Sequence, residues 1–445
     1  MFARLTGMIA LSMLGMAWLS AARAQSISYD PAGYQSMVSG LSADTIPVGT
    51  HITVHNWQQY KRFMPPGMQA LFSGRYMWRF PDDPNFTITI GATRNISMPS
   101  YMRAASEKYK GQTKLRKLPE GGYTVEGYTA GLPFADLDEK DPEAGAKLLY
   151  DNHYYYSYEF LRRFVSYTFL IDRYLNISAQ TGDIAYWRLR HLSDPGYPLN
   201  LPYSDGYMTS GRFSVVAPEQ SKYTTEIQLL PDDPVRLPEV YVFLPSLRRS
   251  LRLTASARCA PALGTDYVGD DSSGNIASPG LFIPVYLGAH KTIGMVHADP
   301  AKIDQPQFFS IRGAVPGWPK PEVGNFEVRT VRVLALLPTP SLGRGYCYGA
   351  KILMIDSETW IPFWFDIYDS SRRLYKVEWD FGTPRPIQTG ENAYTFQGNG
   401  VIMDLQNGHA TATVNTGAWY DRVAPQDLQN AQVMAFPGSL VQVMK

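Results

Sequence analysis

A succession of short strand-like stretches, separated by polar turns, occupies the chain from residue 164 to residue 379. Alternation of apolar and polar side chains predicts β-strands, because neighbouring residues of a strand point to opposite faces. Connections as short as 356–359 and 369–372 join antiparallel neighbours, since parallel strands need a long crossover. The sequence therefore predicts an antiparallel meander, with strands at 164–171, 184–191, 223–229, 240–244, 250–253, 326–337, 351–355, 361–368 and 373–379.

The part of the chain before this meander mixes helices with short strands. We expect helices at 56–63, 68–72 and 98–109, a strand at 86–90 and a hairpin turn at 120–123. Asp141 is expected to cap a helix that begins at Pro142, although the acidic residues around it could instead hold a cation.

The first 24 residues are typical of a secretory signal. Arg4 is followed by an apolar run at 8–18, and small residues flank Arg23 before Gln25. Gln25 stands where a bacterial lipoprotein would have a cysteine, and an uncleaved anchor is the alternative to cleavage. The prediction is an exported soluble protein with one large domain at 25–445, helix-richer at 25–160 and a β-meander at 161–445.

Charge and motifs limit the function. The 41 basic and 40 acidic residues give a formal charge of +1, which excludes binding of nucleic acid through bulk positive charge. Loss of Arg4 and Arg23 with the signal changes this charge to −1. The chain has no nucleophile elbow, zinc-protease, phosphate-loop or dinucleotide-binding motif, so we expect no enzyme, no cofactor and no metal. A triad built from distant residues stays open as the basis of a hydrolase.

Three weaker patterns have ordinary explanations beside functional ones. Cys259 and Cys347 predict one disulfide in an oxidising compartment, with two free buried thiols as the alternative. His51 and His55 have the spacing of zinc ligands but no third ligand nearby. The stretch 270–275 resembles a calcium loop but lacks its spacing and closing glutamate.

Several strands are apolar on both faces, which indicates that something covers each side of the sheet. A curved sheet of this kind can enclose an apolar ligand, and an ordinary two-sided core is the alternative. The residues that we predict to line a hydrophobic cavity are Trp187, Leu189, Phe243, Leu251, Leu253, Val331, Val333, Phe363, Phe365 and Trp379.

A row of arginines follows one of these strands. Arg248, Arg249 and Arg252 could pair with a phosphate or carboxylate headgroup at the mouth of the cavity. The alternative is a solvated strand face, or pairing with carboxylates of the sheet.

Five segments of the chain resemble a large family of Gram-negative periplasmic proteins. That family is catalogued as a domain of unknown function and is often labelled an outer-membrane lipoprotein-sorting protein. The resemblance lies, in order, in 56–74, 105–109, 131–147, the arginine row, and 355–360 with 368–369. The family tends to have a basic, tryptophan-containing run after the third segment, where this chain has 154–158.

The resemblance implies a mainly β (α+β) fold: a large, curved, half-open antiparallel β-barrel with a few packed helices, similar to the lipoprotein carriers LolA and LolB. It also implies genomic company with RND-type transporters and outer-membrane proteins, and it supplies no catalytic residue. The function that we expect is a soluble periplasmic carrier or chaperone for a hydrophobic compound, a lipid or a lipidated protein. A periplasmic hydrolase of envelope lipids or glycans is the alternative.

Overall fold

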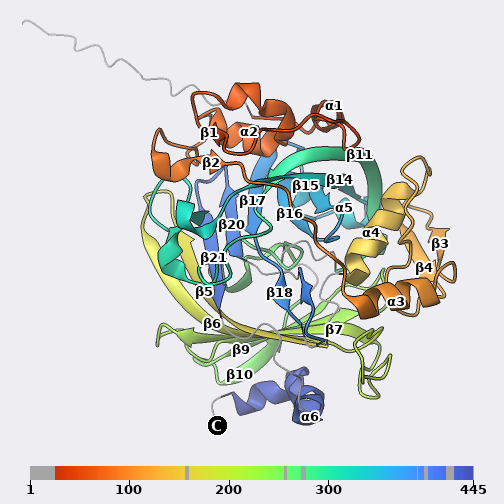
Figure 1. The fold of residues 1–445 in the computed structure, drawn as a ribbon. Coiled ribbons are helices and arrows are strands. Elements are labelled where there is room, and N and C mark those ends of the chain that lie inside the picture. The colour runs from red at the N-terminus through yellow and green to blue at the C-terminus, as the bar shows by residue number, and fades with distance from the viewer. Residues whose placement is uncertain are drawn as a thin grey trace, which may run out of the picture.

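One antiparallel sheet of 13 strands organises the protein (Figure 1). The computed structural model describes residues 26–155, 160–254, 258–271, 277–387, 389–394, 399–416 and 425–443. The strand order is β10-β9-β8-β7-β6-β5-β21-β20-β17-β16-β15-β14-β11. Their bounds are β5 Leu161–Ile171, β6 Ile177–Arg188, β7 Tyr207–Ala217, β8 Thr225–Pro231, β9 Glu239–Leu244, β10 Arg249–Arg252, β11 Phe282–Gly294, β14 Glu327–Pro338, β15 Tyr348–Asp356, β16 Pro362–Asp369, β17 Leu374–Phe381, β20 Asn399–Asp404 and β21 Ala410–Thr416.

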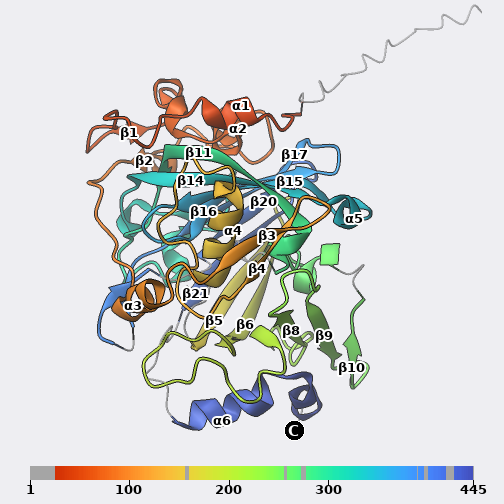
Figure 2. The ribbon, with the colours of Figure 1, turned by 90° about the vertical axis from the view of Figure 1, so that its right-hand side faces the viewer.

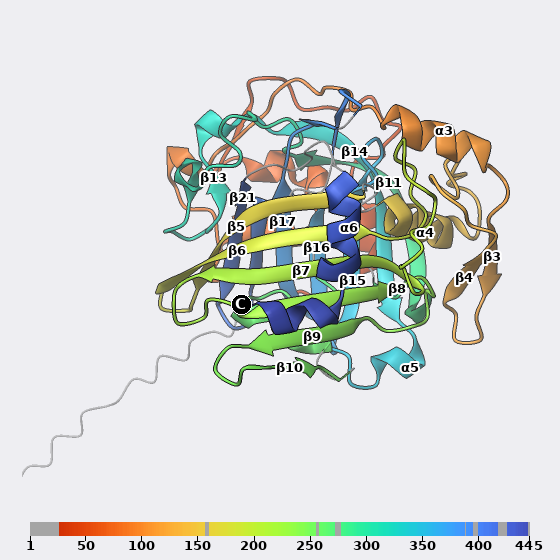
Figure 3. The same ribbon diagram turned by 90° about the horizontal axis from the view of Figure 1, so that it is seen from below.

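The sheet curves strongly, so that β5–β10 cross the direction of β15–β17 (Figure 3). Its two halves meet where β21 pairs with β5, which places Thr413 opposite Thr168 and Asn415 opposite Ser166. The predicted mainly β, half-open barrel is confirmed, and each predicted strand of the meander overlaps an observed one. The concave face, as named below, is the face that carries Thr168 and Thr413.

No strand was predicted at β7, β11, β20 or β21, and the residues of β11 and β21 explain this for those two strands. β21 consists mainly of small residues, so apolar alternation is weak. β11 contains Pro284 and Gly288, and a bulge between Tyr286 and Ala289 breaks its alternation.

The N-terminal part covers the convex face of β16 and β17, at the top of Figure 1. It contains α1 Pro31–Gln35, the 3₁₀ turns Trp57–Gln59 and Lys61–Phe63, and α2 Pro66–Phe72. The amide of Gly67 donates a 3.0 Å hydrogen bond to the buried Asp366 carboxylate. A side chain at position 67 would collide with that carboxylate, so glycine permits this close approach. The helix predicted at 56–63 is a pair of 3₁₀ turns, and the helix predicted at 68–72 is α2.

A second helical region lies on the concave side, where α4 Ala144–Tyr155 packs on β11 and β14 (Figure 2). Asp141 accepts a 2.7 Å hydrogen bond from the Glu143 amide and pairs with Lys147, but α4 begins at Ala144 and not at Pro142 as predicted. The predicted helix at 98–109 is α3 Ser100–Lys108. The predicted hairpin turn joins β3 Lys114–Lys117 to β4 Tyr123–Glu126.

The C-terminal segment covers the convex face of β6–β9 (Figure 3). It consists of α6 Pro425–Met434 and a 3₁₀ turn at Pro437–Gln442. Ser210 on β7 donates a 2.6 Å hydrogen bond to the carbonyl of Ala435, and Arg212 donates one of 2.7 Å to Ser439. Helices therefore cover the convex face at both ends of the sheet.

The predicted disulfide is confirmed, because Cys259 and Cys347 are bonded. Within the described ranges, no helix has the length and apolar character needed to cross a membrane. The predicted signal at 1–24 lies outside the residues that the structure describes. The assignment of 25–445 to a single domain stays a prediction.

Candidate ligand-binding cavity

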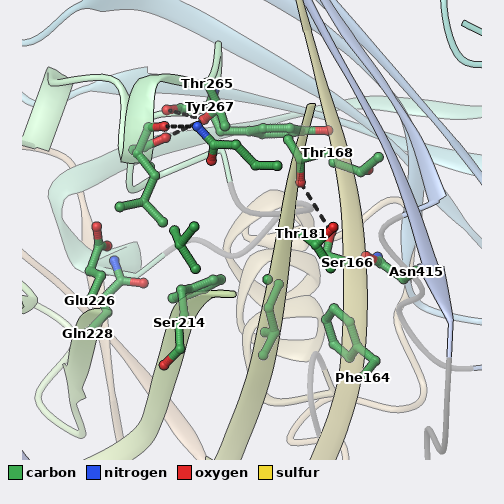
Figure 4. A pocket seen from close by; sticks show the side chains of 18 of the residues that line it. Phe164, Ser166, Thr168, Thr181, Ser214, Glu226, Gln228, Thr265, Tyr267 and Asn415 are labelled. Carbon is green, nitrogen blue, oxygen red and sulfur yellow. Dashed lines mark hydrogen bonds between the residues drawn. The ribbon is translucent and has the colours of Figure 1, made fainter. Parts of the chain in front are cut away.

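A partly enclosed cavity of about 150 Å³ opens on the concave face, between the sheet and a loop that covers it (Figure 4). Its floor is formed by β5, β6, β7, β8 and β21. Its roof is the segment 258–271, which we call the roof loop. The lining residues are Phe164, Ser166, Thr168, Gln180, Thr181, Gly182, Ile184, Tyr186, Phe213, Ser214, Val215, Glu226, Gln228, Ala262, Leu263, Thr265, Tyr267, Val268, Gly269, Thr413 and Asn415.

Strand register brings these side chains together from distant parts of the sequence. One cross-strand row runs Asn415, Ser166, Gly182, Val215. Gly182 leaves the middle of this row without a side chain. A Cβ atom there would meet only the carbonyl oxygen of Ser214 at 3.6 Å and Ile184 at 3.9 Å, which are ordinary contact distances. The missing side chain therefore contributes space to the cavity.

The neighbouring row supplies an apolar wall. It runs Phe164, Ile184, Phe213 across β5, β6 and β7. Tyr186 packs beside them, with its ring centroid 6.2 Å from that of Phe164 and 5.4 Å from that of Phe213. Aromatic rings and an isoleucine give this wall the character of a binding surface for an apolar group.

The next strand, β8, adds a polar end to the cavity. Glu226 continues the Phe213 row, and Gln228 follows on the same face (Figure 4). Burial against the surrounding protein raises the pKa of Glu226 to about 7. Protonation of this carboxyl group therefore changes near neutral pH.

The roof loop is fixed to the sheet at several points. The disulfide holds Cys259, and the carboxylate of Asp266 accepts a 2.8 Å hydrogen bond from Thr411 on β21. Asp271 accepts hydrogen bonds from Tyr348 at 2.5 Å and from Lys351 at 3.2 Å. Although burial opposes its charge, Lys351 and Lys376 hold the pKa of Asp271 below its ordinary value.

These contacts also account for the calcium-like acidic pair. Asp270 binds Arg258 and Tyr346, so both aspartates anchor the roof loop by pairing with side chains. Among the described residues, no group of three or more histidine, cysteine, aspartate or glutamate side chains is arranged to hold a metal ion. His51 contacts Thr89, and His55 pairs with Asp82.

Two buried carboxyl groups near the roof were not expected. Glu378 is 0 % exposed and Asp380 is 5 % exposed, and no described residue donates a hydrogen bond to either carboxyl group. Register places Asp380 in one row with Gly400, Thr413 and Thr168 on the concave face. Burial raises the pKa of both acids, and their proximity to one another raises that of Glu378 further. The signal in the sequence was a charged row, Lys376, Glu378 and Asp380, that alternates with apolar and aromatic residues along one strand.

The residues that we predicted to line a cavity lie elsewhere. Trp187 and Leu189 pack with Ala431 and Ala435 at α6, while Phe243 packs with Leu440. The half-buried Leu251 and Leu253 lie on β10 and just after it. The other five, each at most 1 % exposed, belong to the main core: Val331, Val333, Phe363, Phe365 and Trp379.

None of these ten residues lines the cavity described here. The alternative that we considered, an ordinary two-sided core, describes the positions of those that are buried. Contact between any of the ten and a ligand stays a prediction.

The three arginines proposed for a headgroup are exposed on or beside β10. Arg252 pairs with Glu239 at 3.1 Å, which is the sheet-carboxylate alternative. Arg248 and Arg249 precede it in the hairpin, and none of the three lines the cavity. A headgroup role for them also stays a prediction.

Comparison with solved structures finds similar chains of low sequence identity. A domain from Vibrio parahaemolyticus, provisionally named an outer membrane lipoprotein-sorting protein, is 12% identical over 66% of this chain and 99% of its own, with a TM-score of 0.44. A DUF1329 family protein from Desulfovibrio piger is 12% identical over 62% of this chain and 92% of its own, with a TM-score of 0.43. A LolA superfamily protein from Nitrosomonas europaea is 12% identical over 64% of this chain and 96% of its own, with a TM-score of 0.36.

Comparison with curated proteins finds no match. The profile of a family described as "Protein of unknown function (DUF1329)" matches residues 51–431. This match spans most of the chain. It confirms the resemblance seen in the five segments that follow one another along the sequence, from 56–74 to 368–369. The chain belongs to the DUF1329 family.

Proposed function

We propose that the protein is a carrier that binds an apolar or amphiphilic small molecule in the cavity on its concave face. The observation that carries this proposal is a partly enclosed space of about 150 Å³ with an aromatic wall. A space of this volume encloses a group about the size of benzene, and the open side of the cavity leaves the rest of a longer chain outside it. Transfer of each methylene group from water into such a site contributes about 0.8 kcal/mol, so a short apolar segment supplies useful affinity.

The carrier works in the periplasm, after export by the predicted signal. Neither a nucleotide motif nor a cofactor motif is present in the sequence to drive release. Release therefore depends on a receptor with a better apolar site, because a carrier shifts its ligand only by differences in affinity. An RND-type transporter or an outer-membrane protein, as the family resemblance implies, would be such a receptor.

The test of the binding site uses the space beside Gly182. Gly182→Leu fills this space without a steric clash with the backbone, so binding of an environment-sensitive lipophilic dye should be lost. Gly438→Leu is the matched control, because Gly438 is exposed and no atom lies within 4 Å of its Cβ position. Circular dichroism shows whether each variant is folded. Dye binding by Gly182→Leu at the wild-type level would overturn the proposal.

Two further measurements separate the carrier from the hydrolase alternative. Native mass spectrometry of gently purified protein should show apolar adducts, and Gly182→Leu should lack them. Turnover of ester substrates without such adducts would instead support a hydrolase. The described lining contains one carboxylic acid and no histidine, which favours the carrier.

A further inference from the structure

The polar end of the cavity is formed by Glu226 and Gln228, which alternate with the buried Ile227 and Leu229 on β8. Glu226 stands opposite Phe213 on β7 and Val242 on β9. The carboxyl group is therefore flanked by apolar side chains on both neighbouring strands. Gln228, 5 % exposed, lies under Gly269 of the roof loop.

Neither side chain has a hydrogen-bond partner among the described residues, whereas Gln180 and Ser166 of the same lining do have partners. Gln180 donates a 3.3 Å hydrogen bond to the Leu263 carbonyl, and Ser166 contacts Thr168 at 3.3 Å. A ligand that donates hydrogen bonds to these two side chains gains their interaction energy without breaking a hydrogen bond inside the protein. At this end of the cavity, Glu226 and Gln228 are thus available to contact the polar part of a ligand.

The charge around Glu226 determines which polar group fits. No lysine or arginine is found among the described residues that line the cavity. The titratable groups that face it are Tyr267 from the roof loop and Tyr186 from β6, and burial raises the pKa of Tyr267 well above 10. Arg162 lies 4.8 Å from the Tyr186 ring centroid and is not part of the lining. The ionised cavity therefore carries the negative charge of Glu226 with no cation beside it.

We propose that the cavity selects amphiphiles whose polar group donates hydrogen bonds, prefers an amine to an alcohol, and rejects carboxylates. Glu226 accepts from the ammonium group, Gln228 supplies its amide oxygen as a second acceptor, and the apolar segment lies along Phe164 and Phe213. This selectivity rests on the proposed function, since it assumes that the cavity binds an amphiphile. It differs from the anionic headgroup that the exposed arginines had suggested.

The experiment compares dodecylamine, dodecanol and dodecanoate as competitors of the lipophilic dye at about pH 8, where Glu226 is mostly ionised. The amine should bind at least about tenfold more tightly than the carboxylate, since a hydrogen bond to a charged group is worth at least that factor. Glu226→Gln should weaken amine binding about tenfold or more and strengthen carboxylate binding. The affinity for dodecanol should differ little between Glu226→Gln and the wild type.

Glu219→Gln is the matched control, because Glu219 is exposed on the loop between β7 and β8. This substitution should leave all three affinities unchanged. Equal binding of dodecanoate and dodecylamine by the wild type would overturn the selectivity. So would a Glu226→Gln variant with unchanged amine affinity. The proposed function itself fails if none of the three compounds displaces the dye from the wild type. It also fails if Gly182→Leu still binds the dye and releases it to these compounds as readily as the wild type does.

Discussion

Cys347 and Tyr348, consecutive residues at the start of β15, hold the two ends of the roof loop. Cys347 is bonded to Cys259 at one end, and the Tyr348 hydroxyl donates a 2.5 Å hydrogen bond to Asp271 at the other. The segment between these anchors supplies Leu263, Thr265 and Tyr267 to the cavity. The shape of the ligand site therefore depends on contacts that lie outside it.

Removal of the disulfide should lower the stability of the fold. Cys259 and Cys347 are 88 residues apart, and the chain-entropy treatment gives a contribution of about 4–5 kcal/mol for a loop of that length. We expect the Cys259→Ser, Cys347→Ser double variant to lose up to that free energy of unfolding, measured by urea denaturation. A reducing agent should destabilise the wild type to a similar extent and leave the double variant unchanged. Equal stability of the two proteins under oxidising conditions would contradict this expectation.

The buried pair on β17 should make stability depend on pH. Burial raises the pKa of Glu378 and Asp380 in the folded protein above their unfolded values. The folded state therefore holds more protons than the unfolded state above the ordinary carboxyl range, and stability falls as pH rises. Glu378→Gln with Asp380→Asn should be more stable than the wild type at about pH 8, and the difference should shrink at about pH 4.

Urea denaturation at several pH values tests this, with Glu219→Gln as the control for loss of a surface acid. A double variant that keeps the wild-type pH dependence would show that other groups are responsible.

Binding of an amine should depend on pH through Glu226. Burial raises the pKa of this carboxyl group to about 7, whereas an alkyl ammonium group stays charged up to about pH 10. Affinity for dodecylamine should therefore be low when Glu226 is protonated, rise as pH passes through about 7, and level off above it. Calorimetric titration across this range checks the profile. Glu226→Gln should give a flat profile, and a wild-type profile without a step would contradict the prediction.

Gly67 at the start of α2 should not tolerate a side chain. Its amide donates to Asp366, which also accepts 2.7 Å and 2.8 Å hydrogen bonds from Tyr34 and Trp364. A methyl group would displace the helix from this carboxylate, so Gly67→Ala should lower the free energy of unfolding by about 2–3 kcal/mol. Gly438→Ala, at an exposed position with no atom nearby, should have a small effect. Thermal denaturation of the two variants compares them directly.

The fold was largely predictable because a regular alternation of apolar and polar residues indicates a strand. The strand around Thr225–Pro231 is an example, with Ile227 and Leu229 on one face. Alternation does not reveal which partner covers each face. Trp187 was assigned to a cavity, yet it contacts α6, because a helix from the far end of the chain packs there.

The cavity itself needs contacts that the sequence does not display. It forms where Thr413 pairs with Thr168, although most of the meander separates these two residues in the sequence. It also requires the roof loop to fold back onto the sheet. Glu226 and Gln228 alternate with apolar residues in the sequence, and only the roof loop makes them the end of an enclosed site.

An open sheet has two edge strands with unpaired backbone groups, and here these are β10 and β11. Such a strand can recruit a second copy of the chain and begin aggregation. β10 has only 4 residues, and the exposed side chains of Arg249 and Arg252 lie on it. Two copies that approached through this strand would bring like charges together, which opposes their association. The arginine row thus disfavours edge-to-edge association of two copies through β10.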